Sequence, residues 1–271
     1  MTLDEKYHKL QQILSEFNSV VVAFSGGVDS TLLLKVACNQ LGPDNVLALT
    51  ATSPIFPRYE IEQSSQLAQS FGVRQQLIRS DEMALDSFVE NGPRRCYHCK
   101  HSLFSQFLSV AEKISGRLLD GSNLDDLDDY RPGREALKQL DLRSPLLEAG
   151  LGKQEIRILS RQLGLSTWDK QSFACLATRF PYGTKITVER IQQVDQCETW
   201  LRLQGFTKYR VRYHDQLARI EVAEKDLPRL IKDPLRQNLL ETFKLNGFDY
   251  ITLDLQGYRS GSMNEVLDKT D

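Results

Sequence analysis

One short segment near the start of the chain limits the folds that are available to it. The apolar run V-V-V-A-F at residues 20–24 leads into S-G-G-V-D-S at 25–30 and then into T-L-L-L-K-V-A at 31–37. A short run of apolar residues is typical of a strand that is buried on both faces of a parallel sheet. The sequence therefore predicts a strand, a glycine turn and a helix in succession, which is the first unit of an α/β fold.

The rest of the chain shows two different patterns of predicted secondary structure. Up to about residue 185, predicted strands at 46–49, 73–78 and 118–119 alternate with helical patterns at 3–17 and 59–71, which indicates a parallel sheet. Beyond that point the pattern predicts a small α+β domain on one mixed or antiparallel sheet. Its expected elements are a helix at 187–203, strands at 209–214 and 218–222 joined by a turn at 215–216, a helix at 234–245 and a strand at 250–255. We therefore predict one domain over residues 1–183 and a second over 184–271, which binds substrate or joins subunits.

The glycine turn has the chemistry of an anion site. Gly26 and Gly27 let the backbone approach an anion closely, and the unpaired amides at the helix start attract negative charge. Ser25 and Ser30 add hydroxyl donors. Asp29 is unexpected beside phosphates unless a divalent cation bridges them, so the turn also predicts bound Mg²⁺.

The alternative interpretation of this turn is a glycine loop that only caps a helix. It is not a Walker loop, because no G-K-[ST] follows. The complete string S-G-G-x-D-S after a buried strand resembles the signature of the PP-loop ATP pyrophosphatases, whose domain is adenine nucleotide alpha hydrolase-like. The resemblance implies that the loop holds the β- and γ-phosphates of ATP while the α-phosphate is attacked, so AMP transfer is expected.

Two further strand ends extend this predicted ATP site. Thr50 and Ala51 end the second strand, where the adenine is expected at the carboxyl edge of the sheet. The string D-G-S-N at 120–123 ends a later strand and is followed by Asp125 and Asp126, which either are simply solvated or help to hold the metal. The residues predicted to bind ATP are Ala23, Ser25, Gly26, Gly27, Asp29, Ser30, Thr50, Gly121 and Asn123, and Asp29 and Asp125 are predicted cation ligands.

Three of the five cysteines stand in settings that suggest chemistry. Cys96 and Cys99 form a C-x-x-C among basic residues, and Cys175 lies in A-C-L-A-T-R. The C-x-x-C alone has three interpretations: half of a zinc site, a redox pair, or a chance occurrence. Three thiolates suit a [4Fe–4S] cluster with one iron open to an extra ligand such as sulfide. Cys38 and Cys197 fall inside helical patterns and are interpreted as packing residues.

Charge and the N-terminal sequence narrow the classes of partner. The formal net charge is −2 with both signs interspersed, which gives no support to binding of nucleic acid over many phosphates. The N-terminus is polar, and no apolar run approaches the ~20 residues that cross a bilayer. We therefore expect a cytoplasmic protein without a membrane partner.

Several longer strings lie in both predicted domains. They are R-C-Y-H-C-K at 95–100, D-G-S-N-L-D-D-L-D-D-Y-R-P-G at 120–133, S-P-L-L at 144–147, W-D-K at 168–170, A-C-L-A-T-R-F-P-Y-G-T at 174–184, Y-R-V-R-Y-H at 209–214 and A-R-I-E-V at 218–222. Together with the phosphate loop, these strings resemble one family, the LarE sulfur transferases of nickel-pincer nucleotide biosynthesis. The resemblance implies that a carboxylate of pyridinium-3,5-dicarboxylate mononucleotide attacks the α-phosphate of ATP. A sulfur nucleophile then displaces AMP and leaves a thiocarboxylate.

The same resemblance implies roles for individual residues. Cys175 matches the family's sulfur-bearing cysteine, which some members sacrifice to leave dehydroalanine. Because Cys96 and Cys99 are also present, this chain looks like the three-cysteine variety, for which a [4Fe–4S] cluster carrying sulfide is implied. The remaining implied roles are a catalytic one for Asp29 and for Arg179 at the adenylate, binding of the substrate phosphate by Arg210 and Arg212, and a divalent-cation site that includes Glu198 and Glu221.

Three other functions remain open from the sequence. A PP-loop tRNA thiolase shares the adenylation step and needs an RNA-binding surface. An amidating ligase of the NAD- or GMP-synthetase type leaves the cysteines without a role, and a nucleotide-binding module releases no pyrophosphate. The resemblance also implies a homo-oligomer, for which a hexamer of two trimers is the expected form, and a sulfide donor as a further partner.

Overall fold

The computed structural model describes residues 1–127, 132–171 and 174–259. Its contacts divide the chain into two compact units, and each is described by itself. Unit 1 comprises Met1–Phe88 and Pro93–Phe173, and unit 2 comprises Val89–Gly92 and Ala174–Asp271. The functional division of the chain at residues 183 and 184 stays a prediction.

Unit 1 is built on a four-stranded sheet in which every neighbouring pair is parallel. Its strands are β1 (Val20–Ala23), β2 (Val46–Thr52), β3 (Arg74–Arg79) and β4 (Arg117–Leu119), in the spatial order β3-β2-β1-β4. Each predicted strand is present, and the predicted α/β fold with a parallel sheet is confirmed. Parallel strands end at the same edge of a sheet, so the turns that follow β1, β2 and β4 lie together.

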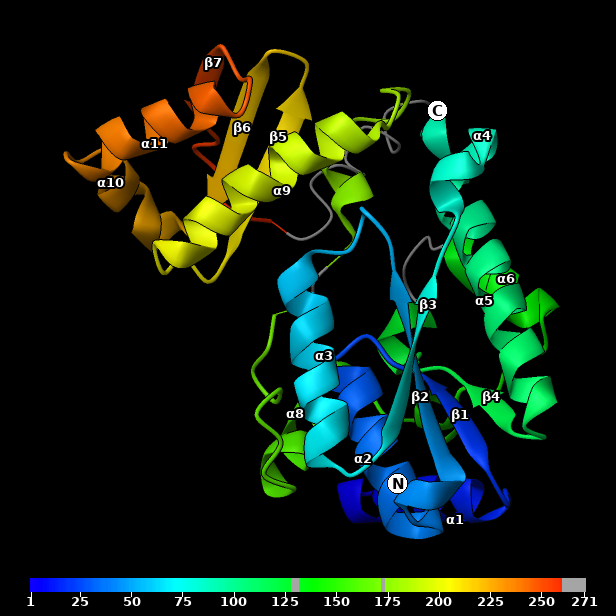
Figure 1. Ribbon diagram of the computed structural model, residues 1–271. Helices are drawn as coiled ribbons and strands as arrows, with labels where there is room; N and C mark the ends of the chain where they lie inside the picture. The colour runs from blue at the N-terminus through cyan, green and yellow to red at the C-terminus, as the bar shows by residue number, and fades with distance from the viewer. Residues whose placement is uncertain (128–131, 172–173, 260–271) are drawn as a thin grey trace. The chain divides into compact units, whose positions relative to one another are not determined.

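Helices cover both faces of this sheet. The described helices are α1 (Leu3–Ser15), α2 (Val28–Leu41), α3 (Arg58–Ser70), α4 (Asp86–Val89), α5 (Arg95–Lys113), α6 (Pro132–Gln139), α7 (Pro145–Glu148) and α8 (Lys153–Gln162). Alternate β1 residues point to opposite faces. Val20 and Val22 pack with α1, α2 and α8, whereas Val21 packs with Phe104 and Phe107 of α5. Figure 1 shows α5 and α6 on one side of the sheet and α2, α3 and α8 on the other.

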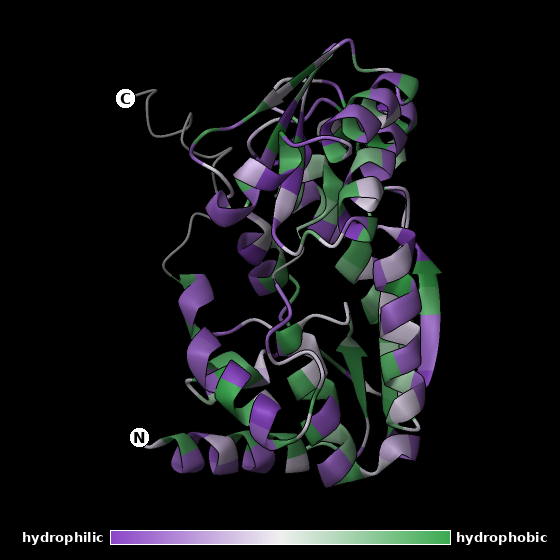
Figure 2. Cartoon of the chain, turned by 90° about the vertical axis from the view of Figure 1, so that its left-hand side faces the viewer, coloured by the Kyte–Doolittle hydropathy of each residue, from purple (hydrophilic) through white to green (hydrophobic). Residues whose placement is uncertain are grey.

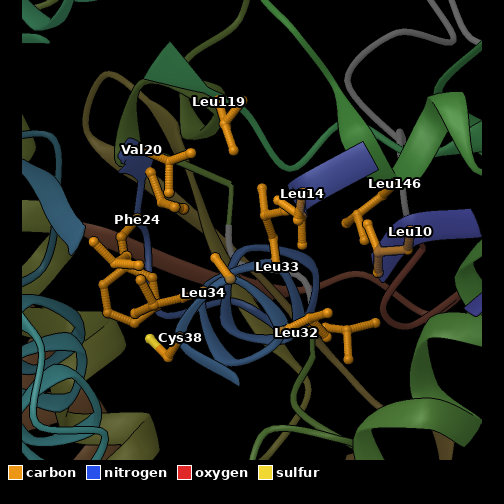
Figure 3. Close-up of a cluster of buried hydrophobic side chains, with 14 of the residues drawn as sticks. Leu10, Leu14, Val20, Phe24, Leu32, Leu33, Leu34, Cys38, Leu119 and Leu146 are labelled. Atoms are coloured by element: carbon orange, nitrogen blue, oxygen red, sulfur yellow. The ribbon is translucent and has the colours of Figure 1, made fainter. Parts of the chain in front are cut away.

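The central helix α2 is apolar on nearly all sides because it lies between the sheet and α1. Leu32, Leu33 and Leu34 are all fully buried, and Figure 3 shows them in one cluster with Phe24, the residue after β1, and Leu10 of α1. A helix that is hydrophobic all round is stable only when it is buried in this way. The outer helices of unit 1 carry mixed purple and green residues in Figure 2, as amphipathic helices that cover a sheet should. The packing of α2 therefore fixes the phosphate loop at its start.

Unit 2 contains a three-stranded mixed sheet, as predicted for this part of the chain. Strands β5 (Tyr209–His214) and β6 (Leu217–Val222) form an antiparallel hairpin, and β7 (Tyr250–Leu253) pairs with β6 in parallel. The helices are α9 (Val188–Leu203), α10 (Leu227–Leu230) and α11 (Leu235–Leu245). Asp215 takes a positive φ of 54° at the predicted hairpin turn. Within the described residues, no helix is both long and apolar enough to cross a membrane.

Candidate functional site

The phosphate loop joins β1 to α2 with the geometry that its glycines predict. Gly26 has a φ of 69°, and a Cβ there would lie 3.0 Å from the Cβ and 3.2 Å from the Cα of Ser64 in α3. Gly27 is the residue before α2 and supplies no side-chain cap to its amides. Ser25 and Ser30 approach each other, with their Oγ atoms 3.2 Å apart. The loop therefore offers backbone amides and two hydroxyls at the positive end of α2.

A cavity of about 430 Å³ opens at the carboxyl edge of the sheet beside this loop. Its lining includes the polar residues Ser25, Asp29 and Ser30. The aromatic rings of Phe104 and Phe107 in α5 form an apolar part of the wall. This pairing of aromatic and polar surface suits a nucleotide. Of the residues predicted to bind ATP, Ala23, Ser25, Asp29, Ser30, Thr50 and Gly121 line the cavity.

The turn after β4 packs directly on the phosphate loop. A Cβ at Gly121 would lie 3.2 Å from the backbone nitrogen of Ser30, so only glycine permits this approach without a shift. Asn123 donates from Nδ2 to Oδ1 of Asp29 at 3.3 Å. Thr50 lies across the edge and donates from Oγ1 to the Phe24 carbonyl at 2.6 Å. The turns after β1 and β4 and the last part of β2 thus lie together. Strand β2 continues to Thr52, beyond the predicted end at residue 49, and binding of ATP at this wall stays a prediction.

The oxygen donors near Asp29 fit the hard cation that the loop predicts. Asp29, Asp120 and Asp126 line the cavity, and Mg²⁺ is usually held by one or two carboxylates together with substrate phosphates. Among the described residues no three His, Cys, Asp or Glu side chains gather as a metal site by themselves. Asp125 instead accepts the backbone N–H of Lys153 at 3.1 Å, at the start of α8. Its role in cation binding stays a prediction.

Two lysines that the sequence analysis did not assign contact the phosphate loop. Lys153 forms an ion pair with Asp29. Lys170 donates from Nζ to the Gly26 carbonyl at 3.2 Å and to Oε2 of Glu60 at 2.6 Å. Arg157 of α8 fixes the segment around Lys170, donating to the Trp168 carbonyl at 2.7 Å and to the Lys170 carbonyl at 2.9 Å. The W-D-K string was the available signal, although nothing local in it shows which loop the lysine reaches.

The C-x-x-C lies in the first turns of α5, a helix that the sequence analysis did not predict. Cys96 and Cys99 are three positions apart on this helix and both are partly exposed. Residues at this spacing share one face of a helix, as two ligands of one metal centre must. Arg94 stacks on the Tyr97 ring, 4.6 Å from its centroid, and pairs with Glu135 at 2.9 Å. The third predicted cluster ligand, Cys175, belongs to unit 2, and the cluster stays a prediction.

The Cys175 segment of unit 2 is anchored by a buried ion pair. Cys175 precedes a short 3₁₀ turn, Leu176–Arg179, and Arg179 is fully buried. Arg179 forms two parallel hydrogen bonds to Glu198 of α9, at 2.8 and 2.9 Å, and donates to the Cys175 carbonyl at 3.2 Å. Glu198 also accepts the Val211 N–H at 2.9 Å. Burial alone would raise the pKa of Glu198, but Arg179, and then Arg210 and the Val211 N–H, more than offset this effect, so the carboxyl pKa lies below its usual value.

The two predicted phosphate-binding arginines are also buried. Arg212 forms two hydrogen bonds to Glu221, at 2.9 and 2.8 Å, and another to the Thr178 carbonyl at 3.0 Å. Arg210 donates to the hydroxyl of Tyr258 at 3.3 Å and stacks on its ring, 5.0 Å from the centroid. Burial, and then the neighbouring Arg179, lower the pKa of Arg210. A cation could bind Glu198 or Glu221 only by displacing the arginine that pairs with each of them. The predicted roles of Arg210, Arg212, Glu198 and Glu221 stay predictions.

The packing interpretation of Cys38 and Cys197 is confirmed, because both are buried. Burial raises the pKa of Cys38 to about 11 and also raises the pKa of Cys197. A thiolate is the reactive form. We therefore expect Ellman's reagent to modify Cys96, Cys99 and Cys175 rapidly in the reduced, metal-free protein and to reach the other two only after unfolding. Rapid labelling of a variant in which those three are alanine would contradict this expectation.

The comparison with protein families first defines the class of unit 1. A family model for NAD synthase matches residues 4–94, which include the phosphate loop, α2, β2 and β3. A parallel sheet with helices on both faces accompanies that match in the structure. Unit 1 is therefore a PP-loop domain of the NAD synthase type.

Individual relatives then identify the family of the whole chain. The chain is 39% identical over 269 residues to pyridinium-3,5-bisthiocarboxylic acid mononucleotide synthase of Lactiplantibacillus plantarum, with 99% of this chain and 97% of that protein covered. It is 42% identical to an uncharacterised protein of Synechocystis, over 98% of this chain and all of that one. An NH₃-dependent NAD⁺ synthetase of Chlorobaculum parvum is 34% identical over 77 residues, 28% of this chain and 27% of that protein. The chain belongs to the family of the L. plantarum synthase, the LarE family, and the resemblance seen in its motifs is confirmed.

Proposed function

We propose that this chain is an ATP-dependent sulfurtransferase that converts a carboxylate of pyridinium-3,5-dicarboxylate mononucleotide into a thiocarboxylate during nickel-pincer nucleotide biosynthesis. The observation that carries the proposal is the nearly full-length similarity to a synthase whose name states a bisthiocarboxylic acid mononucleotide. The phosphate loop and the cavity beside it support the proposal, because their amides, hydroxyls and apolar wall suit a nucleotide such as ATP. The proposal also gives the three accessible cysteines a role.

The first step of the proposed reaction activates a carboxylate. A substrate carboxylate oxygen forms a bond to the α-phosphorus of ATP, and the bond to pyrophosphate breaks, so that an acyl adenylate and pyrophosphate result. The amides after Gly26 and the hydroxyls of Ser25 and Ser30 bind the departing pyrophosphate. Asp29 would hold Mg²⁺, which neutralises the charge that develops there. A carboxylate is a poor electrophile, and adenylation supplies its leaving group.

The second step transfers sulfur to the activated carbon. In one route the Cys175 thiolate displaces AMP, and loss of the Cα proton with cleavage of the Cβ–S bond then leaves dehydroalanine and the thiocarboxylate. In the other route a [4Fe–4S] cluster on Cys96, Cys99 and Cys175 would supply a sulfide as the nucleophile. The presence of all three cysteines favours the second route. Repeated turnover follows when a sulfide donor replaces the transferred sulfur, because no cysteine is consumed.

Unit 2 supplies the candidate residues for the rest of the substrate. Arg210 and Arg212 lie on one face of β5 and are proposed to bind the phosphate of the mononucleotide. Burial, and then the charge of Arg179, lower the pKa of Arg210, and a bound phosphate would favour its charged form. Arg179 contacts the Cys175 carbonyl and is proposed to stabilise the adenylate.

We further propose that the protein is cytoplasmic and forms a homo-oligomer, such as a hexamer. Light scattering would measure its oligomeric state.

Anaerobic incubation with ATP, Mg²⁺, sulfide and the dicarboxylate nucleotide tests this proposal. Wild type should release pyrophosphate only when the nucleotide is present and should form a thiocarboxylate, detected by mass spectrometry. Cys175→Ala should still release pyrophosphate but form no thiocarboxylate, because only the sulfur step needs that side chain. The buried-thiol variant Cys38→Ala serves as the control and should retain both products.

The protein mass distinguishes the two sulfur routes. Loss of H₂S from the protein after one turnover would indicate sacrifice of Cys175, whereas an unchanged mass with repeated turnover would favour the cluster. In the reconstituted protein the cluster predicts about four irons per chain. If Cys96→Ala leaves iron binding and sulfur transfer intact, the cluster route is wrong.

A second candidate is an amidating ligase, which the NAD synthase match over residues 4–94 favours. That enzyme would also release pyrophosphate, but ammonia would replace sulfide as the nucleophile. Its product would form equally well in Cys175→Ala. Pyrophosphate release that depends on ammonia and not on any cysteine would therefore replace the sulfur-transfer proposal.

A further inference from the structure

Lys153 is held in a defined position next to the phosphate loop. It is the first residue of α8, and its backbone N–H donates to Oδ2 of Asp125 at 3.1 Å. The preceding Gly152 N–H donates to Oε2 of Glu155 at 2.9 Å, and Glu155 is itself paired with Lys6 at 2.7 Å. A Cβ at residue 152 would lie 2.9 Å from Oδ1 of Asp125, so glycine permits this close approach. The backbone that carries Lys153 is therefore fixed by two carboxylates.

The Lys153 ammonium uses this position to reach Asp29. Its Nζ donates to Oδ2 of Asp29, while Asn123 donates to Oδ1 of the same carboxylate at 3.3 Å. The Lys153 and Asp29 side chains are 26% and 23% exposed, so solvent screens the pair only in part. An ammonium has three N–H donors, and Asp29 occupies one of them. The remaining donors are available to a further anion.

This contact has opposite consequences for a cation that arrives alone and for one that arrives with ATP. A carboxylate that is already neutralised by an ammonium is a weak ligand for a divalent cation, and the ammonium repels the cation as well. A triphosphate brings several negative charges of its own. The same ammonium then attracts the nucleotide, and the cation is held between phosphate oxygens and Asp29.

We propose that Lys153 makes cation binding at Asp29 conditional on ATP. Its ammonium satisfies Asp29 in the nucleotide-free protein and turns to the phosphates of the bound nucleotide. Lys153 is thus a positioning residue for the metal–nucleotide complex, and this role rests on the ATP use in the proposed function. The proposed function and the role of Lys153 can fail separately. A wild-type protein that does not bind ATP refutes both. If the wild type binds ATP, the Lys153 variants decide whether Lys153 has this role.

Mn²⁺ titration followed by electron paramagnetic resonance provides a measurement that does not depend on turnover. Lys153→Met removes the charge and keeps an unbranched side chain, Lys153→Arg keeps the charge, and Lys138→Met changes an exposed lysine on α6 as the control. Without ATP, Lys153→Met should bind Mn²⁺ about tenfold more tightly than wild type, as expected for loss of a partly screened charged hydrogen bond. Its affinity for Mg²⁺–ATP, measured by calorimetry, should fall about tenfold.

Lys153→Arg and the control should behave like wild type in both titrations, and circular dichroism should show that all the variants are folded. The opposite sign of the two effects is the decisive feature. If Lys153→Met binds Mn²⁺ and Mg²⁺–ATP as wild type does, or binds both more weakly, Lys153 does not impose this condition and the proposal is wrong.

Discussion

Gly26→Ala should abolish tight ATP binding while the protein stays folded. Gly26 has a φ of 69°, a region in which an L-residue costs about 1–2 kcal/mol. The added Cβ would also lie 3.2 Å from the Cα of Ser64, which belongs to the backbone of α3 and has little freedom to yield. The loop must then move away from the nucleotide, and loss of two hydrogen bonds to charged phosphates, at about 1.5–3 kcal/mol each, weakens binding by about 100-fold or more. Calorimetric titration with Mg²⁺–ATP measures this loss.

Gly72→Ala provides a closely matched control. Gly72 follows α3 with a φ of 70°, but a Cβ there would meet nothing within 4 Å. This variant should lose about 1 kcal/mol of stability from the same backbone strain and keep its affinity for ATP. The comparison separates strain from the steric contact with α3. ATP binding by Gly26→Ala within about threefold of wild type would contradict the role of the loop, since the expected loss of affinity is about 100-fold.

The fold was predictable from the sequence because its signals are local. The run at residues 20–24 needs only its own composition to indicate β1, and the hairpin of β5 and β6 follows from two short strand patterns and a turn. The meeting of the turns after β1 and β4 with the end of β2 was also predictable, since the carboxyl ends of parallel strands meet at one edge. Helix α5 was missed, although Phe104, Phe107 and Ala111 are spaced as on a helical face. The cysteine and histidine cluster at its start had suggested a ligand set and not a helix.

The contacts that were not predictable join residues far apart in the chain. Asp29 and Lys153 are 124 positions apart, and Lys170 lies 144 positions from Gly26. The residues around Asp29 and around Lys153 carry no pattern that predicts the ion pair between them. The arginines of β5 show the same limit. Alternation correctly placed Arg210 and Arg212 on one face, but the carboxylate that pairs with Arg212 comes from β6.

Glu198→Gln should destabilise unit 2 by about 3–5 kcal/mol, the usual cost of leaving a buried charge without its partner. Glu198 accepts hydrogen bonds from Nε and Nη2 of Arg179 and from the Val211 N–H. It therefore joins the Cys175 segment, α9 and β5. Glutamine keeps the shape but not the charge, and its amide NH₂ would face the guanidinium. Urea unfolding measures the loss. In a Trp168→Phe background, Trp200 of α9 is the remaining tryptophan and reports on unit 2.

The pH dependence of this loss gives a second test. A carboxyl whose pKa is depressed in the folded state stabilises the protein above its unfolded pKa of about 4.3, and this stability is lost as the pH falls through the folded value. The difference between wild type and Glu198→Gln should therefore be constant from about pH 6 to 8 and shrink below about pH 4.3. Glu241→Gln, on the exposed face of α11, should cost less than about 0.5 kcal/mol at every pH. Should Glu198→Gln be equally harmless, the ion pair with Arg179 does not hold the Cys175 segment in place.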